Sequence, residues 1–270
     1  MSSTDKVFAG SIPKLYDEYL VPMIFSVYAE DIARRVAARS PSTLLEIAAG
    51  TGAVTRAVAA ALPRGVRYVA TDLNEPMLAV AAQRQKDDDR ITWRQADGMA
   101  LPFGDAEFDV VCCQFGAMFF PDRVKAYGEV KRVLKPGGTF VFNVWDRIED
   151  NVVTHEATIA LGKMFPDDPP RFMIRTPHGY HDRAQIRSDL ERAGFRDISI
   201  ETRAETSHAP SADYAATALC QGTPLRNEIE ARDASKLQTA TDLVAEALRA
   251  SHGSGAFDGK IQAIVIEARR

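Results

Sequence analysis

The first half of the chain alternates short apolar runs with segments whose apolar residues recur at helical spacing. The apolar runs predict five strands, at residues 44–48, 66–72, 91–97, 108–115 and 139–145. The segments between them predict helices over 53–62, 74–86 and 122–134. Repeated strand–helix units of this length favour a doubly wound α/β fold, in which a parallel sheet has right-handed crossovers and helices on both faces.

The segments that flank this alternation are less regular. Residues 12–40 have apolar positions near helical spacing, and the proline-rich stretch 165–182 is expected to be irregular. Further helices are predicted at 151–165, 183–193, 211–221 and 226–250, and further strands near 197–203 and at 259–268. Because no linker interrupts the chain, we expect a single domain over residues 1–270. Its helical cap insertions, expected over the ligand edge of the sheet, are 1–40, 146–182 and 206–256.

Composition and charge narrow the kinds of partner. The formal net charge of −4 over 270 residues argues against a nucleic-acid partner, because phosphate binding needs a basic surface. No apolar run approaches the roughly 18 residues that span a bilayer, and the N-terminus lacks the apolar core of a signal peptide. The three cysteines have no metal-ligand spacing, so no metal site is expected. These features predict a cytoplasmic protein without an integral membrane segment, and they leave its oligomeric state open.

A glycine turn follows the first predicted strand, in the stretch LLEIAAGTGAVTRAVA (44–59). Gly50 and Gly52 have no Cβ, so the backbone can approach a ligand closely. In a doubly wound sheet the ligand binds outside the carboxyl ends of the strands, where this turn is expected to lie. Asp72 ends the second strand, 20 positions beyond Gly52, and a carboxylate there can accept both hydroxyls of an adenosine ribose. These features suit a dinucleotide and S-adenosylmethionine (SAM) equally.

Three further features favour SAM. Thr55 stands where a dinucleotide fold usually has a third glycine against the pyrophosphate. Glu46 precedes the turn, and its carboxylate suits a cationic amino group or a role in organising backbone amides but would repel a diphosphate. Asp97 ends the third strand, where it could accept a hydrogen bond from the exocyclic amine of adenine. SAM carries a sulfonium and an amino acid but no phosphate, and it fits all three features.

These segments resemble, in order, the motifs of class I SAM-dependent methyltransferases, and the chain is similar to the group that includes the ubiquinone and menaquinone biosynthesis enzymes. The matching stretches are LLEIAAGTG, ATDLNEPML, QADGMALPFGDAEFDVVCCQFGAMFFPD and EVKRVLKPGGTFVFNVW, which cover roughly residues 40–146. The resemblance implies a seven-stranded, mostly parallel sheet in the order 3-2-1-4-5-7-6, with the last strand in the chain antiparallel. The family's loop often has a glycine where this chain has Ala48. An alanine is compatible there if it keeps a negative φ, so we expect a slight narrowing of the loop and no loss of binding.

The resemblance also implies roles for individual residues in binding SAM and its product S-adenosylhomocysteine. The residues expected at the nucleoside are Asp72 for the ribose, Leu73 and Met77 for the faces of adenine, and Asp97 and Gly98 for its edge. Those expected around the methionine part are Glu46, Ala48, Gly50, Thr51, Gly52 and Gln114. Tyr16 is expected to close over the cofactor from the N-terminal helix.

The catalytic groups are harder to assign, because methyl transfer is an in-line displacement from a sulfonium, which is already a good leaving group. Positioning of the reactants alone can supply roughly 7–11 kcal/mol of the barrier. A general base is needed only where the acceptor loses a proton as it attacks. His178 and His181, in TPHGYHD, are the candidate bases. The alternative is that both are surface or helix-capping residues.

The predicted function is methyl transfer from SAM to a small-molecule acceptor. The alternatives are a nucleotide-dependent oxidoreductase on a Rossmann-type sheet and a SAM-binding protein without catalytic activity. Binding of NAD(H) in place of SAM would favour the first alternative, and persistent inactivity with SAM bound would favour the second. The stretch FGAMFF (115–120) is either the wall of a lipophilic acceptor site or part of the core.

Overall fold

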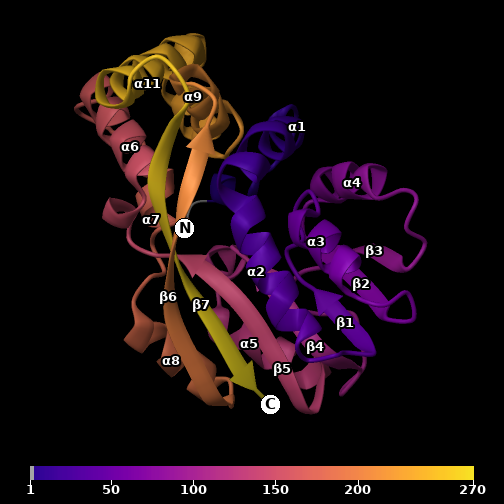
Figure 1. Cartoon of the computed structure of the whole chain (residues 1–270). Coiled ribbons are helices and arrows are strands. Elements are labelled where there is room, and N and C mark those ends of the chain that lie inside the picture. Colours follow the sequence, from indigo (N-terminus) through magenta and orange to yellow (C-terminus); the bar gives the residue numbers. More distant parts are fainter. Residues whose placement is uncertain (1–2) are drawn as a thin grey trace.

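The computed structural model describes residues 3–270, and its central element is a seven-stranded sheet in the order β3-β2-β1-β4-β5-β7-β6. The strands are β1 (Thr43–Glu46), β2 (Arg67–Asp72), β3 (Ile91–Gln95), β4 (Phe108–Gln114), β5 (Leu134–Trp145), β6 (Arg196–Ala209) and β7 (Phe257–Arg269). Strands β1 to β5 pair in parallel, whereas β7 is antiparallel to both of its neighbours, β5 and β6. The predicted fold class, strand order and antiparallel last strand are confirmed (Figure 1).

Helices flank this sheet along the whole chain. Those of the first half are α1 (Ile12–Leu15), a π-helix η2 (Tyr16–Phe25), α2 (Ser26–Ala37), α3 (Ala53–Ala61), α4 (Glu75–Arg84) and α5 (Arg123–Val133). Those of the second half are α6 (Val152–Met164), α7 (Phe172–Arg175), α8 (Arg183–Arg192), α9 (Ala212–Gln221), α10 (Leu225–Asp233) and α11 (Leu237–His252). Short 3-10 turns are η1 (Ser3–Lys6), η3 (Ala117–Phe119), η4 (Ile148–Asp150) and η5 (Ala234–Lys236). No helix within residues 3–270 is both long and apolar enough to cross a bilayer.

The two faces of the sheet pack on different helices, because successive strand residues point to opposite sides. Leu44 and Cys112 belong to a buried cluster that includes apolar residues of α2 and α3. Leu45 and Cys113 belong to the larger cluster, which includes residues of α5 and of the helices in the second half. The adjacent cysteines are therefore buried on opposite faces of the sheet. The structure of residues 3–270 has no group of His, Cys, Asp and Glu side chains that could hold a metal ion.

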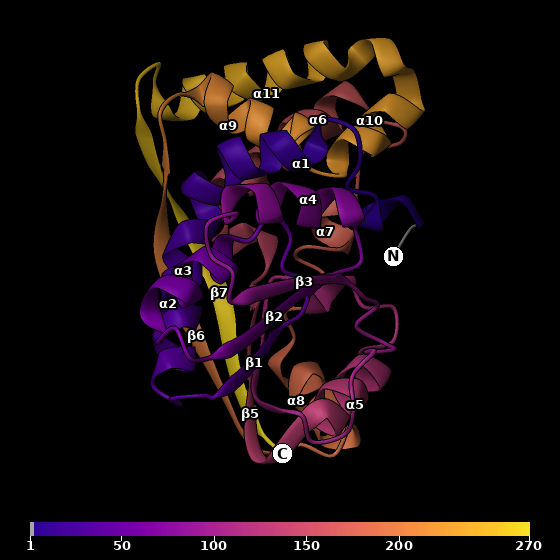
Figure 2. The ribbon, with the colours of Figure 1, turned by 90° about the vertical axis from the view of Figure 1, so that its right-hand side faces the viewer.

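A group of helices lies beyond the carboxyl ends of the strands. Helix α6 follows β5 and α9 follows β6, while α10 and α11 precede β7. Figure 1 and Figure 2 show these helices at the top of the molecule, together with α1. Helix α11 packs on α9 and α6, and α1 contacts α9. Each of the three segments expected to form the cap has a helix at this end, but α2, which also belongs to the segment 1–40, packs with α3 on a face of the sheet.

Several element boundaries differ from the predicted ones. Strand β5 begins at Leu134, directly after α5 and ahead of the KPGG turn that was expected to precede it. The segment 226–250 forms two helices, α10 and α11, and the proline-rich stretch 165–182 contains the short helix α7. Strand β6 continues to Ala209 because it stays paired with β7 along its length. This pairing joins segments far apart in the sequence, which local periodicity does not reveal.

Candidate functional site

The turn after β1 contains three residues in the left-handed region of backbone space. They are Ala48 (φ +54), Gly50 (φ +57) and Gly52 (φ +82). Glycine adopts such angles at little cost, whereas a residue with a Cβ is strained there. The negative φ on which the compatibility of an alanine was expected to depend is therefore not found at Ala48, which adopts the left-handed conformation. Hydrogen bonds from Ile47 N to Cys112 O and from Ala49 N to Thr71 O fix the backbone on both sides of Ala48. The alanine is therefore held in a backbone conformation that glycine usually adopts.

A pocket opens at this turn, beside the point where the strand order reverses between β1 and β4; we call it the cofactor pocket. The predicted residues that line it are Tyr16, Ala48, Gly50, Asp72, Leu73, Met77, Asp97, Gly98 and Gln114. They come from η2, from the turn after β1 and from the carboxyl ends of β2, β3 and β4. This is the crevice in which open α/β sheets bind their ligands.

The Asp72 carboxylate is held in place by main-chain amides in this pocket. Its Oδ2 accepts a hydrogen bond from Gly50 N at 2.8 Å, and its Oδ1 accepts one from Asn74 N at 2.7 Å. Burial raises the pKa of Asp72, and the hydrogen bonds from Asn74 and Gly50 oppose that rise. Oδ1 also accepts a hydrogen bond from Asn74 Nδ2 at 3.4 Å, so Oδ2 is the carboxylate oxygen that retains a lone pair for a ligand hydroxyl.

The residues predicted to surround adenine lie along the same pocket. Leu73 is an apolar side chain that is 43% exposed, so a flat ring laid on it would remove apolar surface from water. The Asp97 carboxylate is exposed and accepts a hydrogen bond from Met99 N at 2.9 Å. A Cβ on Gly98 would come within 3.0 Å of the Phe120 ring. Glycine at this position therefore lets Phe120 pack closely against the loop.

Gln114 presents an unsatisfied acceptor at the end of β4. Its Nε2 donates to Phe25 O at 3.3 Å, and its buried Oε1 has no hydrogen-bond partner among residues 3–270. A buried acceptor without a donor is destabilising, so a donor from a ligand would complete the site. Tyr16 lines the pocket from η2, and burial and the nearby carboxylates of Asp72 and Asp17 raise the pKa of its phenol.

Glu46 does not lie in the cofactor pocket, contrary to expectation. Alternate residues of β1 face opposite sides of the sheet, and Glu46 shares the face of Leu44. Its carboxylate accepts hydrogen bonds from Thr55 Oγ1 at 2.7 Å and from the Tyr68 hydroxyl. Burial raises the pKa of Glu46 to about 7. Thr55, which stands in place of a third glycine, is thus a buried partner of Glu46 behind the turn.

Thr51 and Gly52 also lie outside the residues that line the pocket. Thr51 is buried, and its hydroxyl has no partner within the described chain. Gly52 occupies the position before α3, and a Cβ there would come within 3.1 Å of Ala81 Cβ. Both residues shape the turn and its packing on α4, while the backbone at Ala48 and Gly50 faces the pocket.

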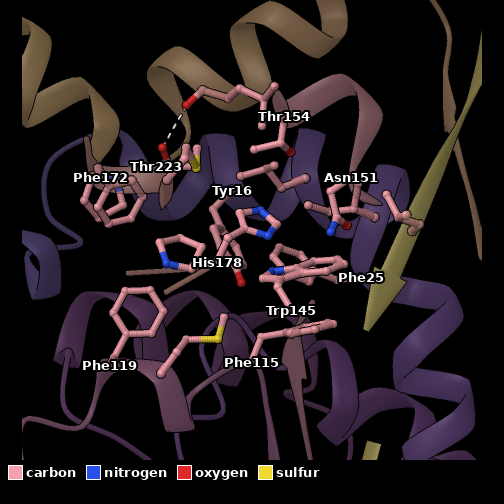
Figure 3. A pocket seen from close by; sticks show the side chains of 18 of the residues that line it. Tyr16, Phe25, Phe115, Phe119, Trp145, Asn151, Thr154, Phe172, His178 and Thr223 are labelled. Atoms are coloured by element: carbon pink, nitrogen blue, oxygen red, sulfur yellow. Dashed lines mark hydrogen bonds between the residues drawn. The ribbon is translucent and has the colours of Figure 1, made fainter. Parts of the chain in front are cut away.

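A second pocket, the apolar pocket, adjoins the first and shares four lining residues with it, Phe8, Tyr16, Phe115 and Phe119. Figure 3 shows aromatic side chains from several elements surrounding its interior. The rings of Phe115 and Trp145 stack with their centroids 3.9 Å apart. The polar side chains on its walls are Tyr16, Asn151, Thr154, His178 and Thr223. Within residues 3–270, no Asp, Glu, Lys or Arg lines it.

His178 lies in the wall of the apolar pocket and is 4% exposed. Its Nδ1 is 2.7 Å from Asp146 O, and since a carbonyl oxygen can only accept, Nδ1 carries the proton. The Nε2 atom then holds a free lone pair. Burial lowers the pKa of His178 to about 4, which keeps the imidazole neutral at pH 7.

His181 is not brought to either pocket. Its side chain is exposed, and its Nδ1 is 2.7 Å from His178 O. The two candidate bases are therefore separated by the structure, with one in a pocket wall and the other on the surface. The sequence pattern could not distinguish them, because both belong to the same irregular stretch.

Several lining residues were not predicted. In FGAMFF, Phe115, Met118 and Phe119 line the apolar pocket and Phe120 lines the cofactor pocket, whereas Ala117 is buried. The stretch therefore contributes both to the core and to the walls of two pockets, and its role as the wall of a lipophilic acceptor site stays a prediction. The other unpredicted residues include Phe8, Trp145, Asn151, Thr154 and Thr223. Trp145 ends β5, so the rule that ligands bind at carboxyl strand ends could have identified it; Phe8 and Thr223 carry no comparable signal.

Comparisons with known proteins give a consistent result. A family model described as a methyltransferase domain matches residues 45–142. A demethylmenaquinone methyltransferase of Lactiplantibacillus plantarum is 38% identical over 179 residues, which are 60% of this chain and 73% of that enzyme. The enzyme of the same name from Clavibacter sepedonicus is 42% identical over 108 residues, but the match covers 40% of this chain and only 43% of that relative.

Solved structures share the fold. The YcgJ protein of Bacillus subtilis superimposes with a TM-score of 0.57 at 18% identity, covering 90% of this chain and 98% of that one. A phosphoethanolamine N-methyltransferase of Haemonchus contortus, solved with S-adenosylhomocysteine, gives 0.52 at 22% identity over 85% of this chain and 49% of that one. These solved structures show the fold, and the family model and the sequence relatives decide between the two cofactor classes. The chain belongs to the SAM-dependent methyltransferase family.

Proposed function

We propose that this enzyme transfers a methyl group from SAM, held in the cofactor pocket, to a small-molecule acceptor held in the apolar pocket. The observation that carries this proposal is the shared wall: Phe8, Tyr16, Phe115 and Phe119 line both pockets. Pockets that share these lining residues adjoin each other, so ligands bound in the two pockets would lie side by side. Holding two reactants in one geometry can contribute roughly 7–11 kcal/mol to lowering a barrier.

The residues of the cofactor pocket fit SAM. Asp72 would accept the ribose hydroxyls, and the unpartnered Oε1 of Gln114 would accept a hydrogen bond from the methionine ammonium group. Leu73 and Met77 would cover adenine, while the turn at Ala48 and Gly50 would lie against the methionine part. When bound, SAM supplies a methyl group on a sulfonium, which an acceptor removes by in-line displacement.

The acceptor is proposed to be uncharged and largely apolar. An ion would lose its hydration on entering a pocket whose described walls contain no Asp, Glu, Lys or Arg, and such desolvation is expensive without a partner charge. Aromatic rings such as those of Phe25, Phe115 and Trp145 favour a flat acceptor. The Thr154 hydroxyl offers a hydrogen bond to a polar group at its edge. The side chains of Asn151 and Thr223 already hydrogen-bond to main-chain groups of Gln262 and Leu219.

His178 is proposed to accept the proton of an acceptor hydroxyl or amine. Its tautomer is fixed by Asp146 O, so the lone pair of Nε2 is available, and its lowered pKa keeps it unprotonated. A neutral imidazole also suits a pocket without counter-ions. His181 has no part in this proposal, because its side chain is exposed outside both pockets.

Titration calorimetry followed by an acceptor screen tests the proposal. The protein is expected to bind SAM and S-adenosylhomocysteine and not NAD(H). Uncharged hydroxylated aromatic compounds are then expected to gain 14 mass units when incubated with SAM and enzyme, while their carboxylated analogues are not. Turnover of the carboxylated analogues alone would contradict the assignment of the apolar pocket, and binding of NAD(H) without SAM would contradict that of the cofactor pocket.

A further inference from the structure

Residues 3–11, which we call the N-terminal strap, contact both pockets. Lys6 lines the cofactor pocket, and Phe8 lines the cofactor pocket and the apolar pocket. The Phe8 ring meets Tyr16 and Phe119 edge-on, with centroids 6.0 Å and 5.9 Å apart. Its backbone N–H lies 3.5 Å from Asn74 Oδ1. The shared wall between the pockets is therefore completed by a segment from the chain's N-terminus.

The strap is fastened along its length to helix α10. Asn227 Nδ2 donates to Thr4 O at 3.4 Å and to Val7 O at 3.2 Å. At the end of the strap, Arg226 Nη1 donates to Ser11 Oγ at 2.6 Å. These contacts involve main-chain oxygens and one hydroxyl, and none of them reaches the loop that carries His178.

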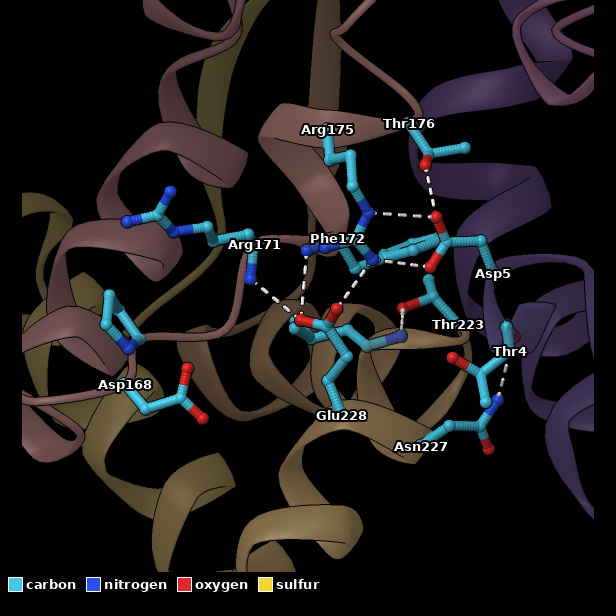
Figure 4. Close-up of polar contacts among 12 residues, drawn as sticks. Thr4, Asp5, Asp168, Arg171, Phe172, Arg175, Thr176, Thr223, Asn227 and Glu228 are labelled. Atoms are coloured by element: carbon cyan, nitrogen blue, oxygen red, sulfur yellow. Dashed lines mark hydrogen bonds and ion pairs between the residues drawn. The ribbon is translucent and has the colours of Figure 1, made fainter. Parts of the chain in front are cut away.

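Asp5 makes the connection to that loop. Its carboxylate is 1% exposed and lies between Arg175 and Thr176 (Figure 4). Arg175 Nη2 donates to Oδ1 at 2.5 Å and Nε donates to Oδ2 at 3.1 Å, while Thr176 Oγ1 donates to Oδ2 at 2.6 Å. Arginine and carboxylate thus meet through two parallel hydrogen bonds, the strongest geometry for such a pair.

A second carboxylate orients the helix on which Arg175 lies. Glu228 Oε1 accepts from Arg175 Nη2 at 2.6 Å. Its Oε2 accepts from the backbone N–H groups of Arg171 and Phe172, at 2.7 Å and 3.0 Å. Glu228 therefore holds the first turn of α7 and also its last residue, as Figure 4 shows. Glu228 of α10 thus holds α7 in place, and the hydrogen bonds of Asp5 attach the strap to the same helix and to the residue that follows it.

The loop after α7 leads directly to the proposed proton acceptor. Thr176 and Pro177 precede His178, whose backbone N–H donates to Met173 O at 2.9 Å. Phe172, Met173, Pro177 and His178 all line the apolar pocket. A displacement of α7 would consequently move one whole wall of that pocket together with the imidazole.

We propose that Asp5 is a positioning residue for methyl transfer. It connects the strap to the α7 loop, so that the strap closes over the cofactor at the same time as His178 is positioned in the apolar pocket. This inference rests on the proposed function. A buried carboxylate without its partner is strongly disfavoured, so the pair is either formed, with the strap docked, or fully solvated, with the strap open. The cofactor enters in the open state, and the pocket wall is complete only in the closed one.

Asp5→Asn tests this inference, with Asp31→Asn as a matched control. Asp31 is also a buried carboxylate, 2% exposed, and it pairs with Arg35 and Arg203 on the far side of the sheet from α5. Hydrogen–deuterium exchange is measured over residues 3–11 and 171–180 with and without S-adenosylhomocysteine, and the release of labelled S-adenosylhomocysteine is timed. In the wild type, the ligand is expected to slow exchange in both segments.

In Asp5→Asn, both segments are expected to lose this protection. Release is expected to accelerate by roughly tenfold or more, the factor for losing hydrogen bonds to a charged group. Asp31→Asn should match the wild type in both measurements. Wild-type release in Asp5→Asn, or loss of protection in the strap alone, overturns the inference.

Two further outcomes are a variant that does not fold and a wild-type protein that does not bind S-adenosylhomocysteine. If Asp5→Asn does not fold by circular dichroism, Thr176→Val, which removes one donor to Asp5, is judged by the same two measurements. If the wild-type protein binds no S-adenosylhomocysteine, the proposed function itself fails, and this is seen before any variant is made.

Discussion

Ala48 and Gly116 lie in direct contact where β1 and β4 end, so closely that a Cβ on Gly116 would come within 2.4 Å of Ala48 Cβ. The same Cβ would come within 2.7 Å of Cys113 Sγ. Ala48 has a φ of +54, which is unfavourable for a residue with a Cβ. Its methyl group packs against Gly116, which has no side chain. The two turns that border the cofactor pocket are thus packed against each other.

This contact predicts that Gly116→Ala destabilises the protein. Overpacking a tight interior site typically costs about 1–3 kcal/mol. Ala48→Gly should partly rescue that loss in the double variant, because it removes the nearer of the two obstructing atoms while Cys113 Sγ remains. Chemical denaturation of the four proteins in this cycle gives the coupling energy. Strictly additive free energies of unfolding would show that the two side-chain positions do not compete for the same space.

Asp72→Ala should weaken binding of SAM by about 1.5–3 kcal/mol, the range for hydrogen bonds to a charged group. Calorimetric titration measures this change directly. Asp89→Ala is the matched control, since the Asp89 side chain is 88% exposed and forms an ion pair with the exposed Arg64. An affinity that is the same in both variants would place the ribose away from Asp72.

Gln114→Leu should discriminate between two ligands of the same pocket. The Oε1 of Gln114 is proposed to meet the ammonium group of the amino-acid tail, and its loss should weaken binding of S-adenosylhomocysteine by about 1.5–3 kcal/mol. Methylthioadenosine has the same nucleoside but no amino acid, so its affinity should not change. Equal losses for both ligands would indicate that Gln114 supports the pocket as a whole.

Glu46→Gln should change how stability depends on pH. Burial, opposed by hydrogen bonds from Tyr68 and Thr55, raises the pKa of Glu46 from 4.5 to about 7. Because the folded-state pKa is the higher one, the contribution of Glu46 to stability is fully present below pH 4.5 and is lost as the pH rises through 7. At about 1.4 kcal/mol per pKa unit, the buried charge costs roughly 3 kcal/mol at alkaline pH.

Glutamine cannot ionise. Between pH 5 and pH 8.5 the free energy of unfolding of Glu46→Gln should therefore increase relative to that of the wild type. Urea denaturation without ligand at both pH values measures it, and the other titrating groups cancel in the comparison. Parallel pH profiles for the two proteins would show that Glu46 is already ionised at pH 5.

The sequence predicts the sheet well because its strands are short apolar runs separated by helices, and the ends of those strands carry the nucleoside-binding candidates. Asp72, Leu73 and Gln114 could be placed in this way, since each directly follows or ends a strand. Glu46 could not, because the carboxyl end of a strand fixes the position of a residue but not the face on which its side chain lies.

The residues of the apolar pocket are much harder to predict from the sequence. Its walls combine Phe8, Trp145, Phe172 and Thr223 from four distant segments, and nothing in their local sequence indicates that they meet. Asn74 illustrates the same limit on a smaller scale. It precedes α4 as a capping residue would, yet its side chain makes no cap hydrogen bond and instead lies near Phe8 N and Asp72.

His178→Asn should reduce turnover by about 10²–10⁴-fold, the usual contribution of general acid–base catalysis, while the affinity for S-adenosylhomocysteine stays unchanged. Asparagine can still donate a hydrogen bond toward Asp146 O, but it offers no basic nitrogen to the pocket. His181→Ala is the matched control and should retain wild-type turnover, because that side chain is exposed. The measurement is the initial rate of labelled methyl transfer to the first acceptor found in the screen.

The pH profile of the same reaction provides an independent check on His178. Its pKa is lowered by burial from 6.5 to about 4, so the imidazole becomes protonated, and loses its lone pair, only as the pH falls through 4. The wild-type rate should therefore be independent of this residue between pH 5 and 8 and should decline in more acidic solution. Turnover that survives in His178→Asn, or an acidic limb that persists unchanged in that variant, would mean that the proton leaves the acceptor by another route.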